Sequence, residues 1–198
     1  MKQCLLTYRQ ACKGDEIKVS NTTKERILPF SFSIFVILAD QISKFLVEKY
    51  IPLRTIKFSF FGDFLRIIHV TNTGAAFSMG DSMSAVKHLV VLCVIPLILL
   101  LALIFFCIKS DDFSKLQRWL VAGVVGGGFG NLIYRFFRPN GVVDFIDVKF
   151  YNLFGLERWP TFNIADSFVL VCIILLAITY IKAIIDEAKS NKNKGEQK

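Results

Sequence analysis

Residues 87–108 read KHLVVLCVIPLILLLALIFFCI, and only the first of them, Lys87, carries a full charge. A helix that crosses a bilayer needs about 20 predominantly apolar residues, so this run predicts a transmembrane helix. Pro96 inside the run predicts a kink, which membrane helices tolerate. Working outward from this segment, three further apolar runs of similar length predict spanning helices over residues 27–47, 117–137 and 163–185.

The composition supports a membrane protein. The chain has 198 residues, of which 54% are hydrophobic and 20 are Phe, and a soluble domain would be less apolar. The net charge of +8 is spread over the flanks of the apolar runs, which is typical of membrane segments and argues against a nucleic-acid partner. We therefore predict an all-α membrane protein, a four-transmembrane-helix bundle over residues 27–187. A cytoplasmic tail (1–26) precedes it, and a cytoplasmic, Lys-rich tail without regular structure (188–198) follows.

The placement of Lys and Arg predicts the orientation of the bundle. Fourteen of these residues lie in the N-terminal tail, the connection between the second and third helices, and the C-terminal end. Eight lie in the other two connections. Because Lys and Arg accumulate on the cytoplasmic side of membrane proteins, both termini are predicted to be cytoplasmic. One bundle is sufficient for the features below, so a monomer is expected.

The first outward connection, residues 49–86, is long and contains a strand pattern. Apolar and polar residues alternate over 56–60 (IKFSF), Gly62-Asp63 offers a turn, and the alternation resumes over 65–69. This pattern predicts a β-hairpin. Because the hairpin has no soluble core to join, we expect its apolar face to lie on the membrane surface.

Two aspartates occur in apolar surroundings, Asp144 in GVVDF and Asp166 in FNIADS. An ionisable group at a membrane segment is costly, and by default it marks a functional site. Two carboxyls in one apolar setting can share a proton, which is the working arrangement of an aspartic protease. Asp147 is the alternative partner of Asp144, but Lys149 follows it and it has the character of a loop carboxylate exposed to water. The pair Asp144–Asp166 is therefore favoured, and Asp144–Asp147 stays open.

Other polar residues are predicted to gather at the same end of the bundle. Asp40 and Lys44 lie near the outer end of the first helix, and Asn131 and Arg135 lie near the outer end of the third. Each pair is spaced i, i+4, so its members share a helix face. Asp166 opens the fourth helix, so all these groups lie within about 15 Å of the outer helix ends.

Two further segments and several absent motifs narrow the chemistry. The small residues of 122–130 (AGVVGGGFG) predict close helix packing in lipid, which would hold the polar residues that follow. Residues 72–77 (NTGAAF) predict a turn of small residues after the hairpin. The sequence contains no His-Glu-x-x-His motif, no Gly-x-Ser-x-Gly motif and no Cys-x-x-Cys pair. Zinc and serine-nucleophile chemistry therefore have little support, and no metal or cofactor is expected.

Five blocks of the sequence together resemble lipoprotein signal peptidase, the bacterial signal peptidase II family. They are Asp40-Gln41-x-x-Lys44, NTGAAF (72–77), Gly126 to Arg135, VVDF (142–145) and FNIADS (162–167). The resemblance covers roughly residues 27–187 and implies an aspartic endopeptidase of the bacterial inner membrane. Such an enzyme removes signal peptides from prolipoproteins by cutting before a diacylglyceryl-modified cysteine. It also implies a small β-sheet platform on the outer face that cradles the substrate beside membrane lipid.

The resemblance also implies roles for individual residues. Asp144 and Asp166 match the catalytic pair of the family. Residues that match substrate-binding or supporting positions are Asn72, Gly74, Asn131, Arg135, Asn163, Asp40 and Lys44. One position departs from the family, because Tyr134 stands where an Asp commonly precedes the arginine. The hydrogen bonds of that Asp must therefore be replaced or absent here.

Two other classes of function fit the polar residues alone. Intramembrane Asp, Lys and Arg also form ion pathways, so a small proton-coupled transporter is the alternative to a peptidase. The carboxylates gather at one face, however, and no inverted repeat is visible. A non-enzymatic assembly factor that docks partners on its hairpin is the third hypothesis.

Overall fold

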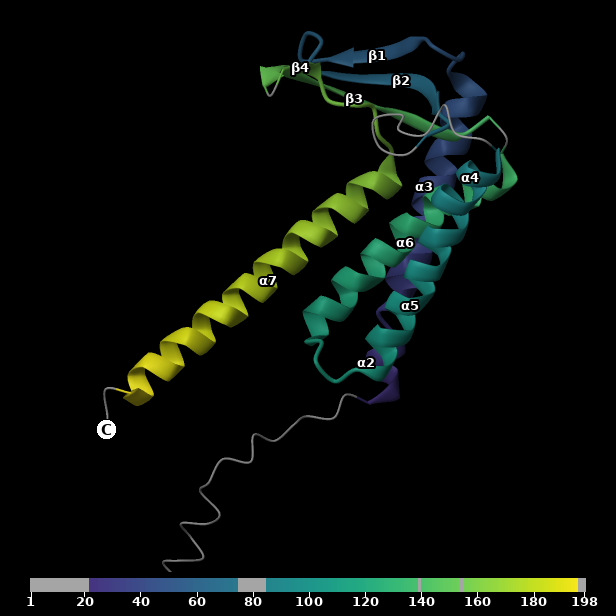
Figure 1. Cartoon of the computed structure of the whole chain (residues 1–198). Coiled ribbons are helices and arrows are strands. Elements are labelled where there is room, and N and C mark those ends of the chain that lie inside the picture. The colour runs from purple at the N-terminus through teal and green to yellow at the C-terminus, as the bar shows by residue number, and fades with distance from the viewer. Residues whose placement is uncertain (1–21, 75–84, 139, 154, 196–198) are drawn as a thin grey trace, which may run out of the picture.

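The computed structural model describes residues 22–74, 85–138, 140–153 and 155–195. Long helices form one part of the molecule and a four-stranded antiparallel sheet covers one end of them (Figure 1). Four of the described helical segments are long and apolar enough to cross a membrane: Thr23–Tyr50, Val90–Lys109, Lys115–Phe137 and Ile164–Lys189. The predicted fold class, a four-helix membrane bundle with a small sheet platform, is confirmed.

The first span begins earlier than the sequence predicted. A short helix, α2 (Thr23–Ile27), precedes α3 (Phe30–Tyr50), with Pro29 between them. Thr22 and Glu25 form a capping box at the start of α2, which satisfies two backbone N–H groups reciprocally. The predicted tail over residues 1–26 therefore ends in helix, and residues 1–21 lie outside the described part.

The second span changes helix type just before Pro96, where the sequence predicts a kink. It runs through α4 (Ala85–Leu89), a π-helical turn η2 (Val90–Val94) and α5 (Ile95–Lys109). Pro96 has no N–H to continue the α-helical hydrogen-bond ladder. In the turn just before it, the Ile95 N–H donates to the carbonyl of Val90, five residues back. The disturbance that the sequence predicted thus takes the form of a local widening of the helix.

The third span, α6 (Lys115–Phe137), is the centre of the bundle and contacts α3, α5 and α7. The glycines of α6 allow these helices to approach it closely. A Cβ on Gly126 would lie 2.9 Å from the backbone of Ser33 in α3, and one on Gly127 would lie 2.5 Å from the carbonyl oxygen of Ala165 in α7. Neighbouring glycines therefore allow close contact with two different helices, which confirms the packing role predicted for residues 122–130.

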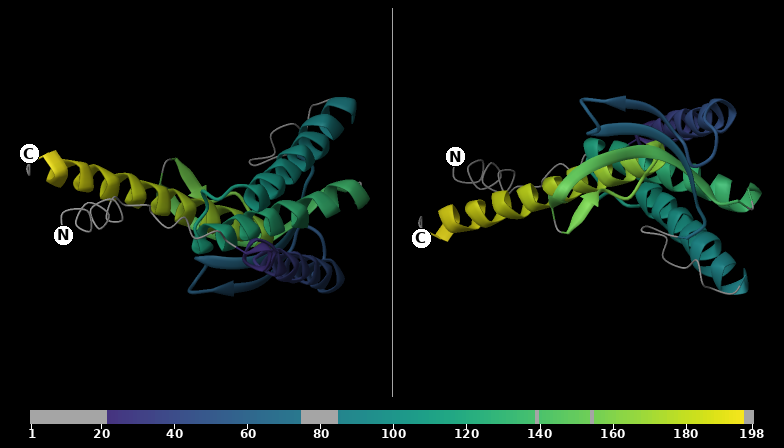
Figure 2. Two further views of the ribbon diagram at one scale, coloured as in Figure 1. Left: turned by 90° about the horizontal axis from the view of Figure 1, so that it is seen from below. Right: turned by 90° about the horizontal axis from the view of Figure 1, so that it is seen from above.

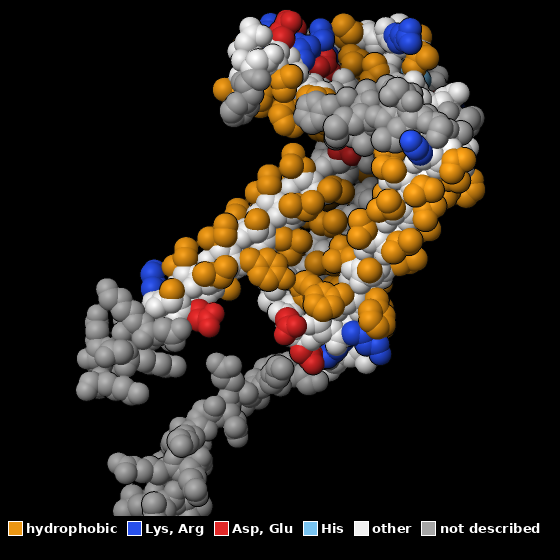
Figure 3. Space-filling view, viewed as in Figure 1, with side chains coloured by type: hydrophobic (Ala, Val, Ile, Leu, Met, Phe, Trp, Pro, Cys, Tyr) orange, Lys and Arg blue, Asp and Glu red, His pale blue; other side chains and the backbone are white. Residues whose placement is uncertain are grey.

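The fourth span, α7 (Ile164–Gly195), extends well beyond the predicted end at residue 185. The prediction of a tail without regular structure is wrong up to Gly195, because no Gly or Pro interrupts the chain before that residue. In Figures 1 and 2, α7 diverges from the other helices as it leaves the sheet. Figure 3 shows apolar side chains over the helices and charged ones toward both ends, as expected for a bundle surrounded by lipid.

The sheet has the order β1-β2-β3-β4, with β1 (Ile56–Phe60), β2 (Leu65–Asn72), β3 (Val142–Leu153) and β4 (Leu156–Arg158). β1 and β2 are the predicted hairpin. An apolar cluster joins the sheet to the C-terminal ends of α3 and α6, and its buried members are Val47, Ile51, Tyr134, Val142, Val143 and Phe145. The sheet is thereby fixed over the helix ends that carry the polar residues.

Candidate active site

The sheet register brings Asn72 and Asp144 together. Asn72 pairs with Val142 on β3, and Asp144 pairs with Val70 on β2. Asn72 and Asp144 are therefore diagonal neighbours on one face of the sheet, where side chains can touch. The Asn72 Nδ2 donates to Asp144 Oδ2 at 3.2 Å. The Gly74 N–H donates to Asn72 Oδ1 at 3.1 Å, which holds the amide in that orientation.

The segment after β4 brings Asn163 to the same place. Phe162 pairs with Ile146 in an isolated antiparallel bridge, through hydrogen bonds of 2.8 and 3.0 Å. The next residue, Asn163, is fully buried and donates from Nδ2 to Asp144 Oδ1 at 2.7 Å. Asp144, itself 3% exposed, thus accepts from two different Asn side chains.

Asn163 also begins α7, and this fixes Asp166. The Asp166 N–H donates to Asn163 Oδ1 at 3.0 Å, and the Asn163 N–H donates to Asp166 Oδ2 at 3.3 Å. This reciprocal pair is a capping box in which Asn and Asp replace the usual residues. A helix N-terminus favours negative charge. The first turn of α7 thus holds the Asp166 carboxyl in place, and Asn163 contacts both aspartates.

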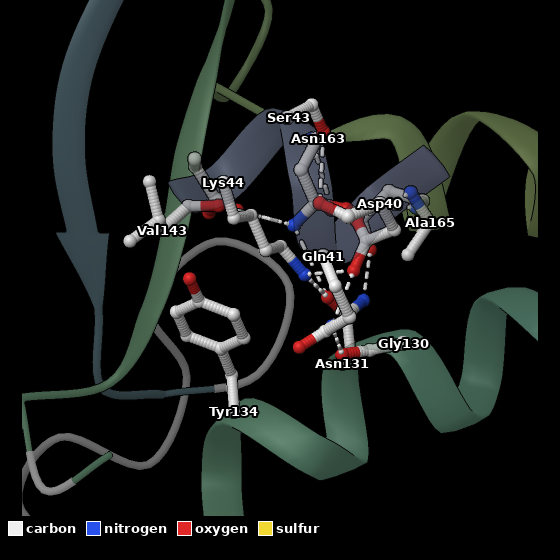
Figure 4. Close-up of polar contacts among 12 residues, drawn as sticks. Asp40, Gln41, Ser43, Lys44, Gly130, Asn131, Tyr134, Val143, Asn163 and Ala165 are labelled. Carbon is white, nitrogen blue, oxygen red and sulfur yellow. Dashed lines mark hydrogen bonds and ion pairs between the residues drawn. The ribbon is translucent and has the colours of Figure 1, made fainter. Parts of the chain in front are cut away.

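A chain of buried polar contacts leads from α3 and α6 to Asp166. Figure 4 shows its members Asp40, Lys44 and Asn131. Lys44 Nζ donates to Asp40 Oδ2 and to Asn131 Oδ1, both at 2.7 Å, and the Asp40 and Lys44 side chains are 0% exposed. Asn131 Nδ2 donates to Asp166 Oδ1 at 2.7 Å. Because its oxygen accepts from a cation, Asn131 must present its amide to Asp166. Gly130 leaves room, since a Cβ there would lie 2.8 Å from Asp40 Oδ2.

A cleft of about 520 Å³ contains both aspartates. The residues that line it are Val70, Thr71, Asn72, Asn131, Arg135, Val142, Asp144, Trp159, Pro160, Thr161, Phe162, Asn163, Asp166, Ser167 and Leu170. Arg135, one turn beyond Asn131 on α6, is half-buried in this wall. Among the described residues its Nη1 is buried without a hydrogen-bond partner. The cleft is therefore lined by two carboxyls and by an arginine that has an unsatisfied donor.

Asp147 lies elsewhere, and the prediction that it is exposed to water is wrong. It is 3% exposed. Arg66 of β2 donates from Nε to its Oδ2, and Arg158 of β4 donates from Nε to its Oδ1, each at 2.7 Å. Lys149, which follows it in sequence, pairs instead with Asp63 at 3.0 Å. Asp147 thus stabilises the sheet, and the cleft brings together the favoured pair, Asp144 and Asp166.

We expect Asp147→Asn to lower stability without loss of turnover. The substitution removes the charge shared by Arg66 and Arg158, and hydrogen bonds to charged groups contribute about 2 kcal/mol each. Thermal unfolding in detergent should therefore occur at a lower temperature, while kcat for the folded protein stays within about threefold of the wild type. If Asp147→Asn is fully folded under the assay conditions and still loses most of its kcat, Asp147 would again be a candidate catalytic partner of Asp144.

The environment of Asp144 favours its protonated form. Burial raises the pKa of Asp144 from its ordinary 3.8 to about 6, and the neighbouring charge of Asp166 acts in the same direction. The hydrogen bonds from Asn72 and Asn163 oppose this rise without cancelling it. A carboxyl with such a raised pKa beside a second carboxyl is the arrangement in which one proton is shared.

This pKa predicts a pH dependence of stability. Between about pH 4 and pH 6 the folded state binds the Asp144 proton more tightly than the unfolded state does. The contribution of Asp144 to stability is therefore present below pH 4 and is lost as pH rises through 6. The stability of Asp144→Asn relative to the wild type should increase across this window by ~3 kcal/mol. Unfolding measured at several pH values checks this, and a constant difference would contradict it.

Sequence reasoning missed part of this site. The sequence did not predict that residues 159–162 form a wall of the cleft, because their position depends on the bridge between Phe162 and Ile146 of β3. Ser167 follows Asn163 by four residues and Leu170 follows Asp166 by four residues, so helical spacing could have identified both. Tyr134 was noted only as a departure from the family pattern. It is buried, and its hydroxyl donates to Glu48 Oε2 at 3.3 Å.

The fold and the site together define an integral membrane protein built around a cleft with two carboxyls. A family model described as signal peptidase (SPase) II matches residues 32–182. The lipoprotein signal peptidase of Treponema pallidum is 48% identical over 166 residues, 84% of this chain and 89% of that protein. The enzyme of the same name from Treponema denticola is 45% identical over 169 residues, 85% and 97% of the two chains. The chain therefore belongs to the signal peptidase II family and is a multi-pass bacterial membrane protease.

Two solved structures, each described as a bacterial membrane enzyme, are similar to this fold. The first has a TM-score of 0.67 and 30% sequence identity, and the match covers 78% of this chain and 88% of the other. The second has a TM-score of 0.65 at 30% identity, covering 78% and 93%. These matches agree with a helical membrane bundle that carries a small sheet.

Proposed function

We propose that this protein is an aspartic endopeptidase that removes signal peptides from prolipoproteins, cutting before the diacylglyceryl-modified cysteine. The observation that carries the proposal is the meeting of Asp144 and Asp166 in one cleft, where Asn163 donates hydrogen bonds to both. The name shared by the curated relatives, lipoprotein signal peptidase, supports the substrate class.

We assign the proton of the pair to Asp144 and the negative charge to Asp166. Asp144 is buried in the sheet and its pKa is raised to about 6. Asp166 accepts from the Asn131 amide, which is oriented by the Lys44 cation, and lies in the first turn of a helix. Both features stabilise a carboxylate. Titration still belongs to the pair, since the groups interact.

The reaction then proceeds by general acid–base catalysis. Asp166 takes a proton from a water molecule, whose oxygen attacks the carbonyl carbon of the scissile peptide. Asp144 gives its proton to the carbonyl oxygen, which forms a neutral gem-diol. Asp166 next returns its proton to the peptide nitrogen, the C–N bond breaks, and a gem-diol hydroxyl restores the proton of Asp144. The products are a carboxylic acid and an amine, and the pair returns to its starting state.

The walls of the cleft suggest how the substrate is held. Arg135 offers an unsatisfied buried donor to a peptide carbonyl, and Trp159 and Leu170 provide apolar surface beside the carboxyls. The diacylglyceryl chains can remain in the bilayer that surrounds α7. Binding energy from the lipid would then position the peptide bond at the carboxyl pair. We place the site at the outer face of the inner membrane, with both termini cytoplasmic and the enzyme a monomer.

A cleavage assay with defined substrates tests this function. The purified protein in lipid nanodiscs is given one prolipoprotein peptide in two forms, with and without the diacylglyceryl group on its cysteine. Mass spectrometry should show a single cut before the modified cysteine, and the unmodified peptide should be cut at least about 100-fold more slowly. Cleavage at another bond, or equal rates for both peptides, would contradict the proposal.

The same assay tests whether the chemistry needs a metal ion. The described residues contain no group of three His, Cys, Asp or Glu side chains that could hold one. We therefore expect the rate to stay unchanged after treatment with EDTA. Proton flux in liposomes without any peptide cleavage would instead favour a transporter.

A further inference from the structure

Tyr134 lies against the cation that organises the site. Its side chain is 4% exposed, and the centre of its ring is 5.0 Å from Lys44 Nζ. Figure 4 shows the ring on the side of the ammonium group away from Asp40. An ammonium group within about 6 Å of an aromatic face is attracted by the ring, and the attraction grows when both are removed from water.

The ring occupies a side of Lys44 that its hydrogen bonds leave open. An ammonium group has three N–H donors, and among the described residues Lys44 uses two of them, on Asp40 Oδ2 and Asn131 Oδ1. Tyr134 follows Asn131 by three residues on α6, so both side chains lie on neighbouring positions of one helix face. The same turn of α6 thus supplies both the hydrogen-bond acceptor and the aromatic ring that Lys44 contacts.

The ring itself is held from its other end. The Tyr134 hydroxyl donates to Glu48 Oε2 at 3.3 Å. Glu48 also pairs with Arg138 at 3.7 Å, and the Arg138 guanidinium lies 5.8 Å from the Tyr134 ring. These contacts come from α3 and from the end of α6, outside the residues that line the cleft.

We propose that Tyr134 is a positioning residue for the peptidase reaction. Its ring holds the Lys44 ammonium against Asn131, and Asn131 in turn keeps its amide directed at Asp166. Tyr134 does not touch the reacting atoms; it acts through Lys44 and Asn131. This inference rests on the proposed function, because it assigns Asp166 the charge that the Asn131 amide stabilises.

A series of ring fluorinations tests the proposal, because fluorine weakens the attraction of a ring for a cation while nearly preserving its shape. Tyr134 is replaced by Phe and by the monofluoro, difluoro and trifluoro derivatives of Phe. Tyr134→Phe should retain kcat within about twofold of the wild type, since the ring remains. The kcat should then fall stepwise with added fluorine to about fivefold below the Phe variant, with KM within about twofold.

Two controls separate the possible outcomes. Glu48→Gln keeps a hydrogen-bond acceptor near the Tyr134 hydroxyl and should leave kcat within about twofold of the wild type. Equal kcat across the fluorinated series, or a loss that appears in KM instead of kcat, would overturn the role of Tyr134. Asp144→Asn is measured in the same assay. If that variant cleaves substrate, the proposed function itself fails; if only the series is flat, the function stands and Tyr134 is structural.

Discussion

Asp144→Asn and Asp166→Asn should each lower kcat by at least about 10³-fold. Asparagine can neither take the proton of the attacking water nor give a proton to the carbonyl oxygen. Because the two carboxyls act on one water and one peptide bond, the loss of either should stop the reaction as completely as the loss of both. Steady-state cleavage of a diacylglyceryl-modified peptide measures kcat, and the double variant should be no slower than either single variant.

The structure offers a matched control for this experiment on the same strand. Asp147 lies three residues after Asp144 on β3 and is equally buried, but its oxygens bind Arg66 and Arg158. Asp147→Asn therefore removes a buried carboxylate without touching the cleft. Turnover by Asp144→Asn or Asp166→Asn above a few per cent of the wild-type rate would contradict the assigned mechanism.

Lys44→Met should be the most destabilising single substitution at the site. It leaves Asp40 fully buried without its cationic partner. Breaking a buried ion pair by removing one member costs about 3 to 5 kcal/mol. The variant should also lose kcat, because Asn131 Oδ1 loses the shorter and charged of its two donors, Lys44 Nζ at 2.7 Å, and keeps only Asn163 Nδ2 at 3.1 Å to orient it toward Asp166. Chemical unfolding in detergent measures the first effect and the cleavage assay measures the second.

A double variant separates these two effects. Asp40→Asn combined with Lys44→Met removes both charges and keeps an oxygen that can accept from the Ala165 N–H, as Asp40 Oδ1 does at 3.0 Å. Replacing both members of a buried pair is often near neutral, so stability should recover by at least about 2 kcal/mol while kcat stays low. Recovery of activity along with stability would show that Lys44 supports only the fold.

The sequence was sufficient for features that depend on local pattern. The four spans, the hairpin over 56–69 and the i, i+4 pair Asp40–Lys44 follow from periodicity and spacing, and the structure agrees with each. The burial of Asp147 could not be predicted in this way. Its partners come from β2 and β4, and Arg66 lies 81 residues away in the chain. Only the strand register brings them together.

The same distinction between local pattern and tertiary contact applies to the candidate site. The sequence placed Asp144 and Asp166 in apolar surroundings and named Asn163 only through the family resemblance. The structure adds that Asn163 contacts both aspartates. The position of Asn163 depends on the bridge between Phe162 and Ile146, and no local sequence pattern predicts that bridge. The contact between Tyr134 and Lys44 likewise needs the packing of α6 on α3. Residue types were thus predictable, while their mutual orientation depended on tertiary contacts.

The two aspartates belong to different parts of the molecule, and this has a consequence for the surrounding membrane. Asp144 lies in the sheet, whereas Asp166 lies in the first turn of α7, and only 6% of the residues in the apolar stretch of α7 are buried by protein. Hydrophobic mismatch makes such a helix change its tilt when the hydrocarbon thickness changes. We expect the separation of the carboxyls, and hence turnover, to vary with acyl-chain length, so lipid composition would tune this enzyme.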